Sequence, residues 1–183
     1  MQINLIPQDE KENGLRYWVE VCSILAKEIP FLNIYLDHKV MDDISCSSID
    51  VYLISNEKMI ELNNRFRGKN KTTDVLTFNS FEVDIEQKGD SFKLLDIITE
   101  TPFSSNELLA EIFICQDVAQ TQAQEFGHSI EDEITRLLIH GSIHALGFDH
   151  EQSSKEAKFM LKQEKILLEK FNTTKKIVPV TVI

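Results

Sequence analysis

The chain has 183 residues, of which 42% are hydrophobic and 27% charged, and its formal net charge at pH 7 is −11. This length and composition suit a single globular domain with a sizeable core and exclude a disordered or collagen-like chain. The acidic balance argues against a general nucleic-acid binder, because affinity for phosphates comes from lysine and arginine.

The chain shows no charged leader followed by an apolar stretch and no apolar run long enough to span a bilayer. Its three cysteines, Cys22, Cys46 and Cys115, are odd in number and contain no C-x-x-C pair. They are typical of reduced thiols in a reducing compartment. We therefore expect a cytoplasmic protein with no membrane partner.

The first half of the chain alternates strand and helix patterns. Apolar and polar residues alternate at 2–6, 48–54 and 74–78, which predicts three strands. Helical periodicity over 15–29 predicts an amphipathic helix, and Ser55 is a good N-cap for a second helix that ends near Arg65.

The second half begins with a polar, acidic segment, 82–108, which we interpret as an insertion or a long hairpin. A strand is predicted over 110–115 and a helix over 118–126. Ser129 with Asp132, and Ser153 with Glu156, resemble capping boxes that open two further helices, the second ending near Phe171. The tail, 172–183, has no clear role.

Three of the five histidines, His140, His144 and His150, follow the capping signal at Ser129. Residues four apart lie above one another on a helix, so the first two rings point the same way. Gly147 can adopt the left-handed conformation that ends a helix, and the following turn can bring His150 toward the other two. Three imidazoles suit zinc and leave a fourth position open, which is a catalytic arrangement.

The same residues resemble the zinc-protease pattern of two histidines four apart, but Gly141 stands where the general-base glutamate would be. A protease would need another carboxylate near the metal, such as Glu111. Gly141 lies in the predicted buried stripe of the helix, where we expect it to permit close approach to another backbone. Asp149 is expected either to orient His150 or to form the turn.

A basic run, 65–71, carries four cations and no acid. Without the glutamate base, a cation that faces the metal would suit a phosphate substrate. We take Arg67 as the catalytic candidate, because its planar guanidinium can hold two phosphate oxygens, and Arg65, Lys69 and Lys71 as substrate-binding residues that position the strand. The alternative is that Arg67 is an ordinary surface cation.

The string H-G-S-I-H-A-L-G-F-D-H from His140 to His150 is similar to the signature of the YbeY family, and 62–78 resembles the family's aromatic-Arg-Gly-Lys and T-D-V-L-[ST]-F block. Thr72 departs from it, standing where proline is frequent. The resemblance implies a single-strand-specific endoribonuclease with one Zn²⁺ held by His140, His144 and His150. It also implies work in 16S rRNA 3′-end maturation and ribosome quality control, with the small subunit and assembly factors as partners.

We therefore expect one zincin-like α+β domain over 1–183, with a mixed sheet of about four strands and about five helices. Either a metal-activated water or the RNA 2′-hydroxyl could be the nucleophile. Two alternatives remain open, a zincin-like metalloprotease and a non-catalytic ribosome-assembly factor with a structural metal.

Overall fold

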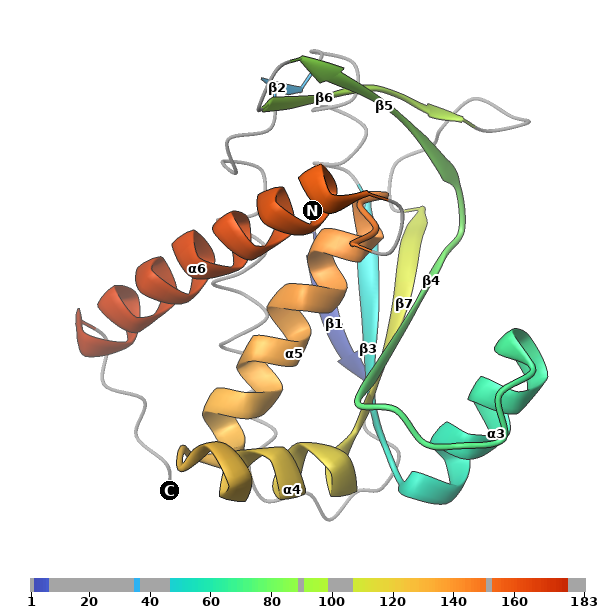
Figure 1. Ribbon diagram of the computed structural model, residues 1–183, viewed down its shortest axis with the longest axis vertical. Coiled ribbons are helices and arrows are strands. Elements are labelled where there is room, and N and C mark those ends of the chain that lie inside the picture. The colour runs from blue at the N-terminus through green and yellow to red at the C-terminus, as the bar shows by residue number, and fades with distance from the viewer. Residues whose placement is uncertain are drawn as a thin grey trace.

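The computed structural model describes residues 2–6, 35–36, 47–88, 91–98, 107–150 and 153–177. These residues form two sheets and four helices (Figure 1). The strands are β1 (Gln2–Ile6), β2 (Tyr35–Leu36), β3 (Ser48–Ile54), β4 (Val75–Asn79), β5 (Glu82–Lys88), β6 (Ser91–Ile98) and β7 (Leu108–Cys115). The helices are α3 (Asn56–Arg67), α4 (Gln116–Phe126), α5 (Ile130–Ala145) and α6 (Ser154–Ile177).

The larger sheet has the strand order β1-β3-β7-β4 and confirms the expected mixed sheet of four strands. The β1–β3 and β3–β7 pairs are parallel, whereas β4 lies antiparallel to β7 at the edge. Alternate residues of β3 and β7, such as Val51 and Ile112, are buried. Because side chains alternate along a strand, one face of this sheet supplies the main core.

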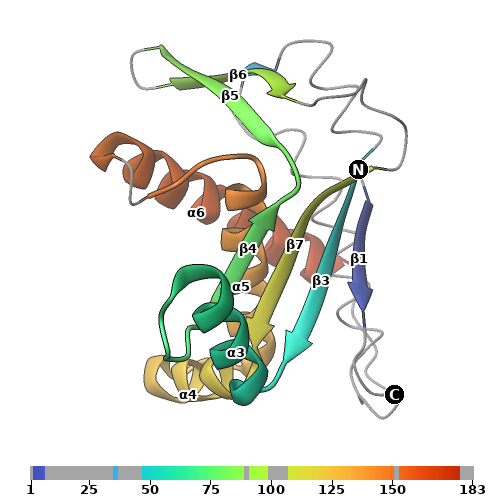
Figure 2. The same cartoon turned by 90° about the vertical axis from the view of Figure 1, so that its right-hand side faces the viewer.

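Helices α4, α5 and α6 lie on one side of the larger sheet, and α5 packs directly against β4 and β7 (Figure 2). The predicted caps of three helices are present. The Ser55 hydroxyl accepts from the Lys58 N–H, and the Ser129 hydroxyl accepts from the Asp132 N–H at 3.1 Å. Gly127 ends α4 with a φ of 72°, in the left-handed region that glycine favours.

Gly141 sets how closely α5 approaches the sheet. A Cβ atom at this position would lie 2.8 Å from Ile112 Cγ2 and 3.2 Å from Thr77 Oγ1. The expected close approach is therefore present, but to side chains of β7 and β4, which corrects our expectation of another backbone. The Thr77 hydroxyl also donates to the Gly141 carbonyl at 3.3 Å, and both contacts hold the helix that carries the histidines against β4.

The smaller sheet, in the order β2-β6-β5, was not expected as a separate sheet. Its strands β5 and β6 pair antiparallel within the segment that we interpreted as an insertion or long hairpin. Helix α6 continues to Ile177, six residues into the segment that we assigned to the tail.

The described part of the chain holds four helices instead of the five expected, because the helix predicted over 15–29 lies outside it. Cys22 and Cys46 also lie outside, whereas Cys115 is a buried free thiol. None of the helices in the described ranges combines the length and apolarity that a bilayer span requires.

Candidate metal centre and its cleft

The three histidines predicted to bind a metal are brought together at the C-terminal end of α5. His140 and His144 share one side of the helix, and the following turn returns the chain so that His150 approaches both. The turn contains Gly147, whose φ is 91° and whose N–H donates to the His144 carbonyl at 2.8 Å. One ligand atom from each imidazole lies within 4.8 Å of the other two, so the three residues are close enough to hold a metal ion.

The contacts of the rings indicate which nitrogens face the centre of the cluster. His140 Nδ1 lies 2.6 Å from Glu164 Oε1, so this nitrogen donates to the carboxylate and leaves the Nε2 lone pair free. His144 makes a hydrogen bond with the backbone of Phe148. The two Nε2 atoms are 3.1 Å apart, close to the roughly 3.3 Å expected between ligand atoms of tetrahedral zinc with bonds of about 2.0–2.1 Å.

The electrostatics of His144 keep its ring neutral, which is the state that binds a metal. Burial lowers its pKa to about 4, and the neighbouring His140 and His150 add to this effect, while Asp149 opposes it. At neutral pH a proton therefore does not compete for this ligand position. The chemistry of the three donors fits a borderline divalent ion such as zinc.

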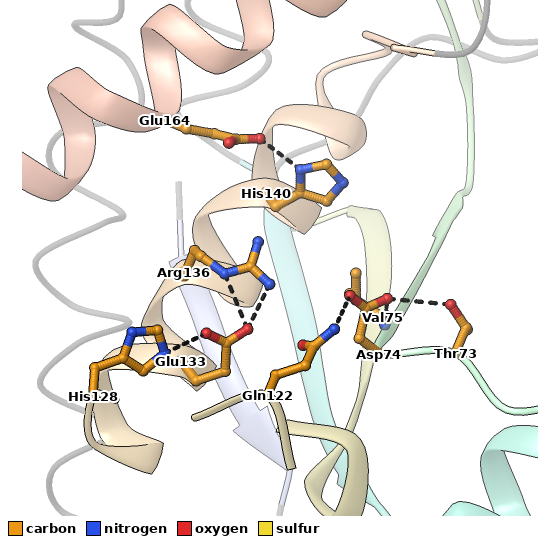
Figure 3. Close-up of polar contacts among 9 residues, drawn as sticks. All are labelled: Thr73, Asp74, Val75, Gln122, His128, Glu133, Arg136, His140 and Glu164. Carbon is orange, nitrogen blue, oxygen red and sulfur yellow. Dashed lines mark hydrogen bonds and ion pairs between the residues drawn. The ribbon is translucent and has the colours of Figure 1, made fainter. Parts of the chain in front are cut away.

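Glu164 on α6 is a site residue that the sequence analysis missed. Its carboxylate and the His140 imidazole are both largely buried, with 16% and 21% of their side-chain surface exposed. Metal-binding histidines commonly donate their second nitrogen to a carboxylate, which fixes the ring orientation and raises its basicity as a ligand. Figure 3 shows the Glu164 side chain reaching from α6 to His140 on α5.

Replacement of Glu164 by glutamine should lower zinc affinity about 10- to 100-fold, the usual effect of losing such a partner. Competition with a chromophoric chelator would measure it. Glu169→Gln, an exposed position on the same helix, serves as the matched control. Equal affinities for the Glu164 variant and the control would show that the carboxylate does not support the metal centre.

A cleft of about 940 Å³ lies between α5 and β4, and the three histidines line it. Arg67 and Lys69 line the same cleft, so the structure places two of the four predicted cations in the cleft that the three histidines line. Arg67 is the last residue of α3, and Lys69 lies in the loop that follows it. The buried Asn63 holds this loop, because its amide donates to the Lys71 carbonyl at 2.7 Å. The other lining residues are Thr73, Asp74, Val75, Thr77, Asn79, Arg136, Leu137, Gly147, Phe148 and Asp149.

The two remaining cations of the basic run do not line this cleft. The Arg65 guanidinium lies over the Phe66 ring at 5.2 Å from its centroid. The side chain of Lys71 is exposed. We predicted that Arg65 and Lys71 bind the substrate strand. In the structure both residues lie outside the cleft that the histidines line.

Arg136 is a further cation in the cleft that the sequence analysis did not single out. It lies one turn before His140 and is paired with Glu133, whose side chain is fully buried. His128 Nε2 approaches the same carboxylate at 2.6 Å (Figure 3). Burial acts to lower the pKa of Arg136, but the hydrogen bond and charge of Glu133 outweigh it and raise the pKa.

Asp149 lines the cleft, whereas Glu111, the carboxylate considered for a protease, lies outside it. The Asp149 N–H donates to Glu156 Oε2 at 3.1 Å, so its main chain takes part in the junction with α6, and its side chain lines the cleft. Glu111 is not among the lining residues and hydrogen-bonds Tyr52 instead. Because Ile112 faces α5, its neighbour Glu111 points to the other face of the sheet, and it does not supply the carboxylate that a protease would need.

The fold and the site together define an α+β protein with a cluster of three histidines in a cleft bordered by cations. The family described as Endoribonuclease YbeY matches residues 22–172. The chain belongs to this family.

Individual relatives agree with the family match. The chain is 39% identical to the Endoribonuclease YbeY of Leptospira interrogans, over 72% of this chain and 92% of that protein. It is 35% identical to that of Aquifex aeolicus, over 68% and 70% of the two chains. The solution structure of TM1509 from Thermotoga maritima superposes with a TM-score of 0.56 and 25% identity, covering 97% of this chain and 93% of that one.

Proposed function

We propose that this chain is a zinc-dependent endoribonuclease that cleaves single-stranded RNA. The observation that carries the proposal is the placement of Arg67 and Lys69 in the same cleft as His140, His144 and His150. The names of the relatives, which are endoribonucleases, support the reaction class. A metal site beside an arginine suits a phosphodiester, whose transition state carries negative charge on its oxygens.

The residues divide into a metal-binding set and a substrate-binding set. His140, His144 and His150 would hold one Zn²⁺, which when bound supplies Lewis-acid stabilisation of negative charge on a phosphoryl oxygen. Arg67 would bind two oxygens of the scissile phosphate through its planar guanidinium. Lys69 would contact the strand inside the cleft.

Arg65 and Lys71, outside the cleft, would hold the strand beyond it through phosphate contacts that do not read sequence. This arrangement favours an unpaired strand. Single-stranded RNA can rotate its backbone to present one phosphate to a recessed site, whereas a duplex is held in A-form geometry.

We further propose that the substrate is ribosomal RNA, with a role in 16S rRNA 3′-end maturation and ribosome quality control in the cytoplasm. The small ribosomal subunit and its assembly factors would be the partners. The support is the likeness of 62–78 and of the histidine motif to the YbeY pattern, together with the family match. A net charge of −11 adds a physical reason for such partners, because an acidic protein has little general affinity for RNA and benefits from recruitment to its substrate.

A chelation experiment tests the reaction and its metal together. The purified protein should cleave a single-stranded RNA oligonucleotide, lose that activity in a chelator, and regain it with one equivalent of zinc per chain. The same RNA hybridised to its complement should resist cleavage, and casein should remain intact. Cleavage that continues after complete metal removal, or cleavage of casein but not of RNA, would contradict the proposal.

A further inference from the structure

Arg136 has hydrogen-bonding capacity that its structural contacts do not use. A guanidinium group carries five N–H donors. Glu133 Oε1 accepts from Arg136 Nε at 3.0 Å and from Nη2 at 2.5 Å. These two contacts leave both N–H groups of Nη1 and one of Nη2, and within the described residues no other acceptor takes them.

The same contacts fix the position of the guanidinium group. Glu133 is fully buried, and it is held in turn by His128 at 2.6 Å. A buried carboxylate requires a charged or hydrogen-bonding partner, so Arg136 cannot swing freely into solvent as a surface arginine does. Its side chain nevertheless keeps 34% of its surface exposed and lines the cleft. Preorganised donors of this kind bind an anion with a smaller entropic cost.

The position of Arg136 relative to the metal site indicates what it would bind. Residues 136, 140 and 144 are spaced by four, so Arg136 lies on the same side of α5 as the two ligands, roughly 6 Å along the axis from His140. Figure 3 shows it on α5 between Glu133 and His140, on the helix that carries the metal ligands. This displacement by one helical turn is comparable to the separation of adjacent phosphates in an extended strand.

The charge of the cleft favours an anion at this position. Arg67, Lys69 and Arg136 contribute three positive charges, against two negative charges from Asp74 and Asp149. Without Arg136 the arginine, lysine and aspartate side chains that line the cleft would carry equal numbers of positive and negative charges. The buried carboxylate of Glu133 balances the charge of Arg136. Because Glu133 does not line the cleft, a strand in the cleft would meet the N–H groups of Arg136 and not this carboxylate.

We propose that Arg136 forms a second phosphate subsite, which binds the phosphodiester next to the one that lies at the metal. This inference rests on the proposed function, since it assumes that the strand in the cleft is RNA. Arg136 is a positioning residue: it sets the register of the strand so that one phosphate meets Arg67 and the histidines. An RNA with a single phosphodiester cannot use the subsite, whereas one with two or more can.

The test compares oligonucleotide length with the charge at residue 136. Binding of metal-loaded protein to fluorescent 2′-O-methyl oligonucleotides with one, two or three phosphodiesters is measured at several KCl concentrations. The wild-type protein should gain on the order of 10- to 100-fold in affinity from the second phosphate, with a salt slope steeper by about 0.7. Arg136→Gln should bind the one-phosphate probe as wild type does and gain neither affinity nor slope from the second phosphate.

Two further variants separate phosphate binding from folding. Arg136→Gln leaves Glu133 with His128 alone, so the double variant Glu133→Gln with Arg136→Gln removes the buried charge as well and preserves a neutral hydrogen-bonding pair. It should fold, retain zinc and show the same loss of length dependence. Lys58→Gln, which removes an exposed cation outside the cleft, should keep the wild-type length dependence.

The binding experiment tests the Arg136 subsite separately from the proposed endoribonuclease activity. If Arg136→Gln and the double variant gain from the second phosphate as wild type does, the subsite is overturned. The subsite is also overturned if both variants lose affinity equally for the probes with one, two and three phosphodiesters. Cleavage of unmodified RNA is scored separately: failure of the wild-type protein to cleave would remove the proposed function, while the length dependence would still decide whether Arg136 binds a phosphate.

Discussion

Substitution of His144 by alanine is expected to remove the bound metal and RNA cleavage together. His144 lies between the other two histidines in the chain, and its Nε2 atom is 3.1 Å from His140 Nε2. Losing a carboxylate that only orients a ligand costs about 10- to 100-fold in metal affinity, so losing a ligand itself should cost more than about 100-fold. Elemental analysis after dialysis and a single-stranded RNA cleavage assay would measure the two losses.

His128→Ala is the matched control, because His128 is a histidine outside the metal cluster. This variant should keep one zinc per chain, although it removes the contact of His128 with Glu133 and leaves that carboxylate with Arg136. Thermal unfolding of both metal-free variants would be compared with that of the metal-free wild-type protein. Similar unfolding temperatures would show that the alanine at 144 leaves the fold intact. If His144→Ala retained stoichiometric zinc, the assignment of this residue as a ligand would be wrong.

Arg67→Ala is expected to separate metal binding from chemistry. The variant should keep zinc and fold normally, since Arg67 is exposed at the end of α3 and none of the described residues forms an ion pair with it. Cleavage should fall by on the order of 10²- to 10³-fold, the usual effect of removing one donor that stabilises transition-state charge. Single-turnover cleavage under saturating RNA would isolate the chemical step.

Lys58→Ala provides the comparison for Arg67, because it removes a positive charge from the same helix at a position paired with Glu61 at 2.9 Å and outside the cleft. Its cleavage rate should match that of the wild-type protein. Normal cleavage by Arg67→Ala would remove the arginine from the reaction. It would also favour the alternative of an assembly factor in which the metal serves the fold.

Local sequence signals predicted much of the histidine cluster. The spacing of His140 and His144 is a property of one helix, and the φ of 91° at Gly147 is a property of one residue, so both could be inferred without knowledge of tertiary contacts. The caps at Ser55 and Ser129 and the four strands of the larger sheet followed from similar short-range patterns.

The contacts between distant elements could not be predicted in the same way. Glu164 is one of several acids on α6, and its contact with His140 spans 24 residues, so nothing in its neighbourhood distinguishes it from a solvated glutamate. The smaller sheet depends on β2 pairing with β6 across more than 50 residues. Such pairings are set by tertiary packing, which local propensity does not encode.

Arg136 differs from Glu164, because its alignment with the histidines could have been inferred from the sequence. It stands four residues before His140, and the periodicity that aligned the two histidines also aligns this arginine with them. The structure adds the buried Glu133 that holds it, and this partner gives the position its significance.

Anomalous diffraction at the zinc absorption edge from crystals of the metal-loaded protein tests the central claim most directly. We predict one peak per chain, coordinated by imidazole nitrogens of His140, His144 and His150, with the fourth position occupied by solvent or by a phosphate oxygen. A peak located elsewhere, or a fourth protein side chain such as Asp149 closing that position, would contradict a catalytic metal in this cleft.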